Sequence, residues 1–246
     1  MRGPTGISRL GPYLLTALLT SAAAAQESPS DEQITEILKS RVDTFRQTVG
    51  IVVGIVDSSG TRVVGYGPSH KGGTDQVDGS TIFEIGSISK VFTGVLLADM
   101  VHKGEVSLRD PAADYLPSSV VLPTRSGRQI TLLDLATHRS GLPRMPDQLS
   151  VGKAVSGNTF TLEEMYAFLS ETTLAFDIGE RYHYSNLAFG LLGHTLARRA
   201  GPNSAPNSRT NYEALLIERV CEPLGLSDTR VLLNAEQQDR LAGTHT

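Results

Sequence analysis

A serine and a lysine three residues apart, at the start of an apolar segment, constrain this chain more than any other feature. Ser87-Ile-Ser-Lys90 follows Phe83-Glu-Ile-Gly86 and continues into an apolar stretch that ends near Val101. The pattern predicts a short strand end, a glycine and then a helix that begins at Ser87. Side chains three apart lie on one face of a helix, so the Ser87 hydroxyl and the Lys90 amine are expected to be within reach of each other.

Such a pair has a specific chemical use. A serine hydroxyl is a poor nucleophile until a base takes its proton, and a lysine can be that base when burial or a neighbouring cation keeps its amine neutral. The free N–H groups at a helix start can also stabilise an oxyanion. A second match to the spacing, Ser150-Val-Gly-Lys153, lies in a polar stretch without helical periodicity. We interpret it as a chance match.

Residues 1–25 have the pattern of a secretory signal. Two arginines are the only charges, an apolar run ends at Thr20, and small residues lead to Ala25. A transmembrane anchor is the alternative, but the run is shorter than the roughly 20 apolar residues that span a bilayer, and a glycine–proline pair interrupts it. We therefore predict cleavage after Ala25 and a secreted or periplasmic protein with no stable membrane span.

The composition of the chain indicates a globular protein at residues 26–246 and argues against nucleic acid as a partner. Hydrophobic residues make up 39% and charged residues 20% of the chain, as in ordinary globular proteins. Lys and Arg are not in excess, so nucleic acid is not an expected partner. The lone Cys221 lies in an apolar pattern and is expected to pack in the core.

Periodicity and breakers predict mostly helices after one hairpin. Strands are expected at 51–56 and 61–66, around a glycine turn. A two-stranded sheet with one helix is marginal alone, so such a chain borrows strands or lacks some. Helices are predicted at 31–48, 87–101, 130–137, 161–170, 185–199 and 211–223, with Thr131 and Thr161 as N-caps.

Tyr184-Ser-Asn186 forms a second polar group at the predicted start of a helix. A tyrosine and an asparagine two apart at this point can both face a cleft. The phenol can relay protons if a nearby ammonium lowers its pKa, and the amide can bind a substrate carbonyl or hold Lys90 in place. The chain has no G-x-S-x-G, which excludes the α/β-hydrolase type of nucleophile.

Taken together, these motifs make the chain resemble the serine β-lactamase and penicillin-binding protein family, which uses the S-x-x-K pattern. The likeness is greatest to the class C branch with its D-alanyl-D-alanine carboxypeptidase and esterase relatives. It covers nearly everything after the signal. The supporting stretches occur in family order at 83–94, 104–111, 130–143, 179–186 and 223–229.

The resemblance implies an α/β (α+β) fold, with an antiparallel sheet flanked by helices and a helical lobe at roughly 105–205. Ser87 is the expected nucleophile, and its backbone N–H is expected to form one half of an oxyanion hole. Lys90 and Tyr184 are expected to share the acid and base roles, and Asn186 to bind the substrate amide. No metal or organic cofactor is expected.

A third family motif, a Lys- or His-led glycine tripeptide on a later strand, is not found. Lys71-Gly-Gly73 precedes the nucleophile and is interpreted as a loop, and His245-Thr246 is too close to the tyrosine motif. The chain is therefore expected to be the first two-thirds of a domain, without its C-terminal sheet strands. The oxyanion hole is then half complete, which reduces the expected rate by about 10²–10³-fold or more.

The six histidines have no metal-ligand spacing. His138 is interpreted as a cation at a helix C-terminus, His183 as a packing or surface residue beside the cleft, and His194 as structural. Arg144 and Met145 follow a loop that borders the site in relatives, so a substrate contact there is one hypothesis.

The substrate stays open among β-lactams, peptidoglycan D-Ala-D-Ala peptides and esters. These share the acylation step and differ in how water reaches the acyl-enzyme. A penicillin-binding or sensor module that acylates without turnover, and an inactive fragment, are the other hypotheses. The oligomeric state does not follow from the sequence.

Overall fold

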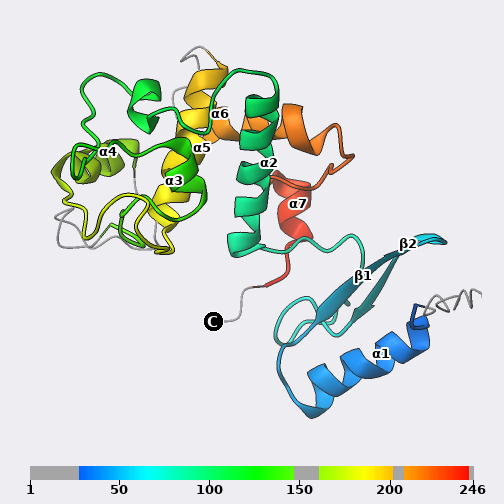
Figure 1. The fold of residues 1–246 in the computed structure, drawn as a ribbon. Helices are drawn as coiled ribbons and strands as arrows, with labels where there is room; N and C mark the ends of the chain where they lie inside the picture. Colours follow the sequence, from blue (N-terminus) through cyan, green and yellow to red (C-terminus); the bar gives the residue numbers. More distant parts are fainter. Residues whose placement is uncertain (1–27, 147–160, 202–207, 244–246) are drawn as a thin grey trace, which may run out of the picture.

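The computed structural model describes residues 28–146, 161–201 and 208–243. Figure 1 shows two groups of elements joined by extended segments. The elements are α1 (Asp31–Lys39), β1 (Ile51–Asp57), β2 (Gly60–Tyr66), α2 (Ser89–His102), α3 (Leu132–Ala136), α4 (Leu162–Glu171), α5 (Asn186–Ala200), α6 (Ser208–Leu216) and α7 (Ala235–Asp239). The predicted signal at 1–25 and the chance match at Ser150 and Lys153 lie outside the described residues.

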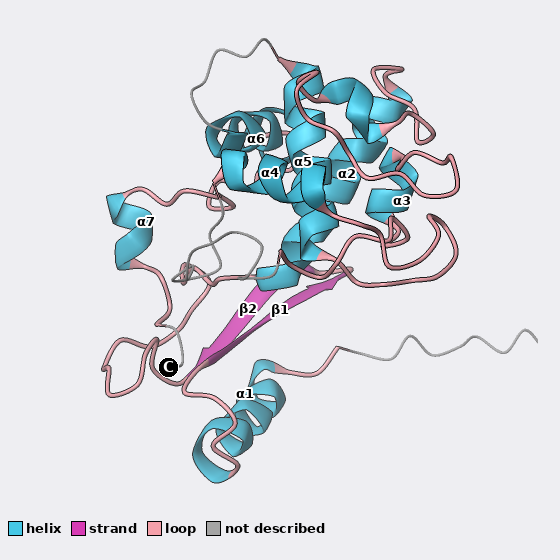
Figure 2. Ribbon diagram, turned by 90° about the vertical axis from the view of Figure 1, so that its left-hand side faces the viewer, coloured by secondary structure: helices cyan, strands magenta, loops and turns pink. Residues whose placement is uncertain are grey.

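The first group, here called the N-terminal unit, consists of α1, β1 and β2. A capping box between Ser30 and Gln33 begins α1. The helix is shorter than predicted: it ends in a π-helical turn at 40–44, and Arg46 takes a positive φ of 49°. The predicted hairpin is confirmed, with an antiparallel register that pairs Ile51 with Tyr66. In both ribbon views the hairpin lies between α1 and the other helices (Figure 2).

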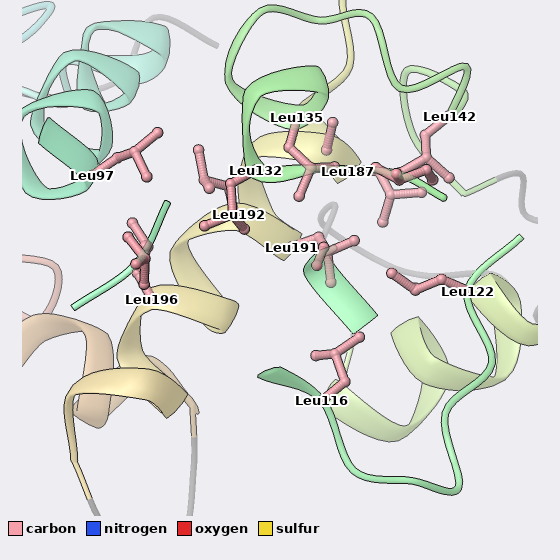
Figure 3. Packing of buried hydrophobic residues seen from close by; sticks show 14 of the residues in the cluster. Leu97, Leu116, Leu122, Leu132, Leu135, Leu142, Leu187, Leu191, Leu192 and Leu196 are labelled. Atoms are coloured by element: carbon pink, nitrogen blue, oxygen red, sulfur yellow. The ribbon is translucent and has the colours of Figure 1, made fainter. Parts of the chain in front are cut away.

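The second group, here called the helix cluster, consists of α2 to α6. Helix α5 lies at its centre and contacts α2, α3 and α6. Figure 3 shows Leu191 and Leu192 of α5 among leucines from α2 and α3. Both side chains are fully buried. The predicted caps Thr131 and Thr161 are confirmed, each in a capping box with the residue three positions later. Cys221 is buried in this cluster, as predicted.

Two segments far apart in sequence connect the groups. The chain after α7 runs beside 69–82: Ala242 N–H donates to the Ile82 carbonyl at 2.8 Å, and Gly243 N–H donates to that of Ser69 at 2.9 Å. Ile82 forms one parallel bridge with Leu241. The predicted strand end at 83–85 is wrong, because no backbone pairs with those residues in the described part of the chain. Strand propensity alone does not supply a partner strand.

Within 28–146, 161–201 and 208–243, no helix is both long enough and apolar enough to span a bilayer.

Candidate active site

The nucleophile candidate lies in a tight turn that leads into α2. Gly86 has a φ of 51°, a left-handed conformation that favours glycine. It opens a 3₁₀ turn, Gly86–Ile88, and α2 begins at Ser89. Ser87 is therefore in the 3₁₀ turn and Lys90 in the first turn of the α-helix. Residues three apart are aligned in such a turn, and the Lys90 ammonium donates to Ser87 Oγ at 3.3 Å.

The second polar group is held at the start of α5 by Ser185. This N-cap residue is fully buried, and its hydroxyl accepts from Ala188 N–H at 2.9 Å and donates to the Pro143 carbonyl at 2.6 Å. Asn186 N–H donates to the carbonyl of Arg144 at 2.9 Å. The start of α5 is thereby fixed to the loop 138–144, which determines where the flanking Tyr184 and Asn186 side chains point.

The structure brings the four predicted site residues together. Tyr184 Oη lies 2.6 Å from Ser87 Oγ. Lys90 donates to Asn186 Oδ1 at 2.9 Å, and its Nζ is 4.9 Å from the centre of the Tyr184 ring. A hydroxyl, an ammonium, a phenol and an amide thus share one hydrogen-bonded group. Proton transfer between the first three needs no further movement of the chain.

A cavity of about 580 Å³ opens beside this group. Ser87, Lys90 and Asn186 line one end of it. Thr93 of α2 and Tyr212 of α6, whose hydroxyls lie 2.7 Å apart, also line the cavity. Its volume lies within the range of small-molecule sites.

The phenol of Tyr184 has the electrostatic surroundings that a proton relay needs. Its pKa is lowered from the ordinary value, first by interaction with Lys90 and then by the hydrogen bond with Ser87. The positive charges of Lys90 and Arg144 act in the same direction, and partial burial opposes them. Positive charge and hydrogen bonding both favour the phenolate, so Tyr184 releases a proton at a lower pH than an isolated tyrosine.

His138 is a residue whose role the sequence analysis predicted wrongly. We expected a cation at a helix C-terminus. Its side chain is buried, and Nδ1 accepts the Ser185 N–H at 3.0 Å. Burial first, and then the charge of Lys90, lower the pKa of His138, which favours the neutral ring. The ring also packs 4.5 Å from that of Tyr184. His138 therefore positions the tyrosine.

His183 and His194 differ in burial and in their partners. His183 is exposed, and its Nδ1 is 3.2 Å from the carbonyl oxygen of Leu142. His194 is buried, its Nε2 lies within hydrogen-bond distance of the Tyr166 hydroxyl, and it lines the same cavity as Ser87, so its interpretation as structural stays a prediction. The described ranges contain no group of three or more His, Cys, Asp or Glu side chains that could hold a metal ion.

The loop 138–144 is the part of the site that the sequence analysis underestimated. It was expected only to border the site, as in relatives, but it provides the acceptors for Ser185 and Asn186 and places Arg144 over the Tyr184 ring. Gly141, with a φ of 79°, allows the loop to turn beside the Phe176 carbonyl. The signals in the sequence were Gly141 and Pro143, which indicate a turn, and the resemblance to relatives in which this loop borders the site.

The chain is similar to known proteins over most of its length. Residues 38–246 match the family model described as "Beta-lactamase". The chain is 31% identical over 234 residues to the D-alanyl-D-alanine-carboxypeptidase/endopeptidase AmpH of Escherichia coli (strain K12), covering 93% of this chain and 58% of that protein. It is 29% identical over 214 residues to a beta-lactamase of Pseudomonas fluorescens, covering 85% of this chain and 54% of the relative.

A solved structure is similar as well. The crystal structure of a beta-lactamase/D-alanine carboxypeptidase from Yersinia pestis superposes with a TM-score of 0.74 at 28% identity. The superposition covers 86% of this chain and 58% of the other. The chain therefore spans less than two thirds of the length of these relatives.

Proposed function

Because the chain belongs to the Beta-lactamase family, we propose that it is a serine hydrolase that forms an acyl-serine intermediate with β-lactams or D-Ala-D-Ala peptides. The observation that carries this proposal is the 2.6 Å contact between Ser87 Oγ and Tyr184 Oη, beside the Lys90 ammonium. The related carboxypeptidase and beta-lactamase names support the two substrate classes. A location outside the cytoplasmic membrane belongs to the same proposal, because peptidoglycan is assembled there.

The first half of the proposed reaction follows from the geometry. Ser87 Oγ attacks the substrate carbonyl carbon, and its proton passes to the Tyr184 phenolate, or to Lys90 when its amine is in the neutral form. The Ser87 N–H stabilises the oxyanion that forms on the carbonyl oxygen. The same proton then goes to the leaving nitrogen as the carbonyl–nitrogen bond breaks, which leaves an ester on Ser87. Asn186 holds Lys90 through Oδ1 and offers its amide N–H₂ to the acyl group.

The second half needs a water that attacks the ester. In the described part of the chain, no Asp or Glu side chain hydrogen-bonds to Ser87, Lys90 or Tyr184. Deacylation therefore reuses Tyr184 or Lys90 as the base. If neither can activate water, the acyl-enzyme accumulates, and the protein acts as the penicillin-binding or sensor module that is the second candidate function.

Labelling with a fluorescent penicillin, followed by intact mass, tests the proposal. We expect one adduct on Ser87 that Ser87→Ala abolishes, and a fall of about 10²–10⁴-fold in the labelling rate for Tyr184→Phe. Ser89→Ala is the matched control, because Ser89 lines the same cavity but lies outside the proposed proton relay. Absence of labelling in the folded wild-type chain would contradict acylation.

A chromogenic cephalosporin, a D-Ala-D-Ala peptide and a nitrophenyl ester, assayed side by side, then distinguish the substrates. Steady product release with one of them identifies a hydrolase for that class. A persistent mass adduct without product release identifies the acylating sensor.

A further inference from the structure

Arg144 is a charged residue of the site that the proposed reaction does not use. Its carbonyl accepts the N–H of Asn186 at 2.9 Å and that of Leu187 at 3.3 Å, so its backbone is fixed at the start of α5. Its guanidinium carbon lies 5.0 Å from the centre of the Tyr184 ring. The side chain is exposed, and no carboxylate of the described residues pairs with it.

Other arginines of the chain show what this one lacks. Arg128 bonds the carboxylate of Asp134, Arg219 that of Glu105, and Arg240 that of Asp228. A guanidinium presents a planar fork of N–H donors that matches a carboxylate in a bidentate contact. The Arg144 side chain is exposed, lies over the ring of Tyr184 and has no carboxylate partner among the described residues.

The position of Arg144 also indicates which part of a substrate it meets. Its backbone adjoins Asn186, the residue whose amide is proposed to bind the acyl portion. We propose that Arg144 binds a carboxylate on the acyl side of the substrate and so makes the site selective for acyl groups that carry a negative charge. This inference depends on the proposed acylation of Ser87 in one respect, which is the position of the acyl group. The inference is tested separately from catalysis.

The first test is a binding measurement in the Ser87→Ala variant, which cannot form an acyl-enzyme. Succinanilic acid and butyranilide are amides of similar size that differ by a carboxylate in the acyl chain. Calorimetry is expected to show about three- to tenfold tighter binding of the acid. The lower value corresponds to an exposed ion pair and the higher value to a bidentate charge-assisted contact. Adding Arg144→Gln is expected to remove this preference.

The matched control is Arg181→Gln. Arg181 is also exposed and lies over an aromatic ring, 4.2 Å from the centre of Phe176, but it does not contact Tyr184. The control is expected to keep the preference for succinanilic acid. Equal binding of the two anilides by the Arg144-bearing protein, or loss of the preference in the Arg181→Gln control, would overturn the inference.

The second test uses turnover of 4-nitrophenyl hemisuccinate and 4-nitrophenyl butyrate. Arg144→Gln is expected to raise KM for the hemisuccinate several-fold and to lower the ratio of the two kcat/KM values by about three- to tenfold. Any effect of the charge on Tyr184 is common to both esters and cancels in the ratio. Arg144→Lys keeps the charge without the fork and is expected to restore part of the ratio. An unchanged ratio overturns the inference.

The two levels of proposal fail in different ways. If neither ester is hydrolysed but succinanilic acid is preferred and the preference needs Arg144, acylation is wrong and the carboxylate contact stands. If both esters are hydrolysed with a ratio that Arg144→Gln does not change, acylation stands and the contact is wrong.

Discussion

The helix cluster and the N-terminal unit differ in how much apolar surface each of them buries. The cluster surrounds α5 with an extended set of buried side chains from α2, α3 and α6. The N-terminal unit buries Ile34, Leu38 and Val64, whereas Phe45 and Val56 are 64% and 79% exposed. Each described residue proposed to act in catalysis lies in the cluster or in the turn that leads into it. The proposed site therefore depends on the helix cluster, which is the better packed of the two. The N-terminal unit can unfold locally before the cluster does.

The largest expected difference between the two groups is in core truncations. Leu191→Ala in α5 is expected to lower the free energy of unfolding by about 2–5 kcal/mol, because it leaves a cavity among fully buried neighbours. Leu38→Ala in α1 is expected to lie at or below the lower end of that range, since its small cluster can collapse onto the gap. Urea unfolding followed by circular dichroism measures both. Equal losses would show that the two groups unfold as one unit.

The next effect is the acid sensitivity of the helix cluster through His194. Burial first, and the charge of Arg198 second, lower the pKa of His194 to about 4. The unfolded chain binds that proton near the ordinary value of 6.5. Between these two pH values the unfolded state holds more protons, so stability is full above about 6.5 and falls as the pH is lowered, by up to about 3 kcal/mol.

Unfolding midpoints from pH 7 to pH 4 test this expectation. His194→Gln carries no titrating ring and is expected to lose this part of the slope. His102→Gln, at the exposed end of α2, is the control and is expected to keep it. If the unfolding midpoint falls with pH equally in the wild type and in His194→Gln, the acid sensitivity belongs to other groups.

A smaller effect compares two helix caps. Ser185→Ala is expected to cost about 1–2 kcal/mol, because it removes the bond from Ala188 N–H and leaves the Pro143 carbonyl without its donor. It is also expected to slow the labelling of Ser87, since Tyr184 and Asn186 flank the cap. Ser30→Ala, at the start of α1 in the N-terminal unit, is expected to cost about 1 kcal/mol or less without slowing labelling. Slower labelling by the α1 variant would connect that unit to the site.

The smallest expected effect is that of a surface ion pair. Arg62 of β2 pairs with Asp31 at an exposed position of the N-terminal unit, so Arg62→Ala is expected to change the free energy of unfolding by about 1 kcal/mol or less. Arg219→Ala is expected to cost more, because that arginine is only 15% exposed and bonds both oxygens of Glu105 at 2.8 Å. Thermal unfolding in low and high salt measures both. A greater loss for Arg62→Ala would reverse the ranking of the two groups.

The family and fold class were recognisable from the sequence. The TM-score of 0.74 and the family match at 38–246 confirm the resemblance and the mixed fold of helices and a small antiparallel sheet. The motifs that carried the resemblance are short and local, so one sequence was enough to show them. The catalytic roles proposed for Ser87, Lys90, Tyr184 and Asn186 stay predictions until the labelling experiment is done.

Local elements were determined by the sequence itself. The caps at Ser30, Thr131 and Thr161, and the hairpin turn between β1 and β2, depend on residues within a few positions of each other. Short-range geometry is the same in any chain with those residues. The end of α1, by contrast, was predicted at residue 48, whereas the helix ends at Lys39.

Only the tertiary structure decided which distant groups meet. Ser87 and Tyr184 are 97 residues apart and come into contact because α2 and α5 pack together and loop 138–144 fixes the start of α5. The same packing buries His138, which favours the neutral form of a predicted cation. Among the described residues no strand pairs with 83–85, and Arg144 lies over the Tyr184 ring. Burial and pairing depend on long-range contacts, which composition and periodicity do not encode.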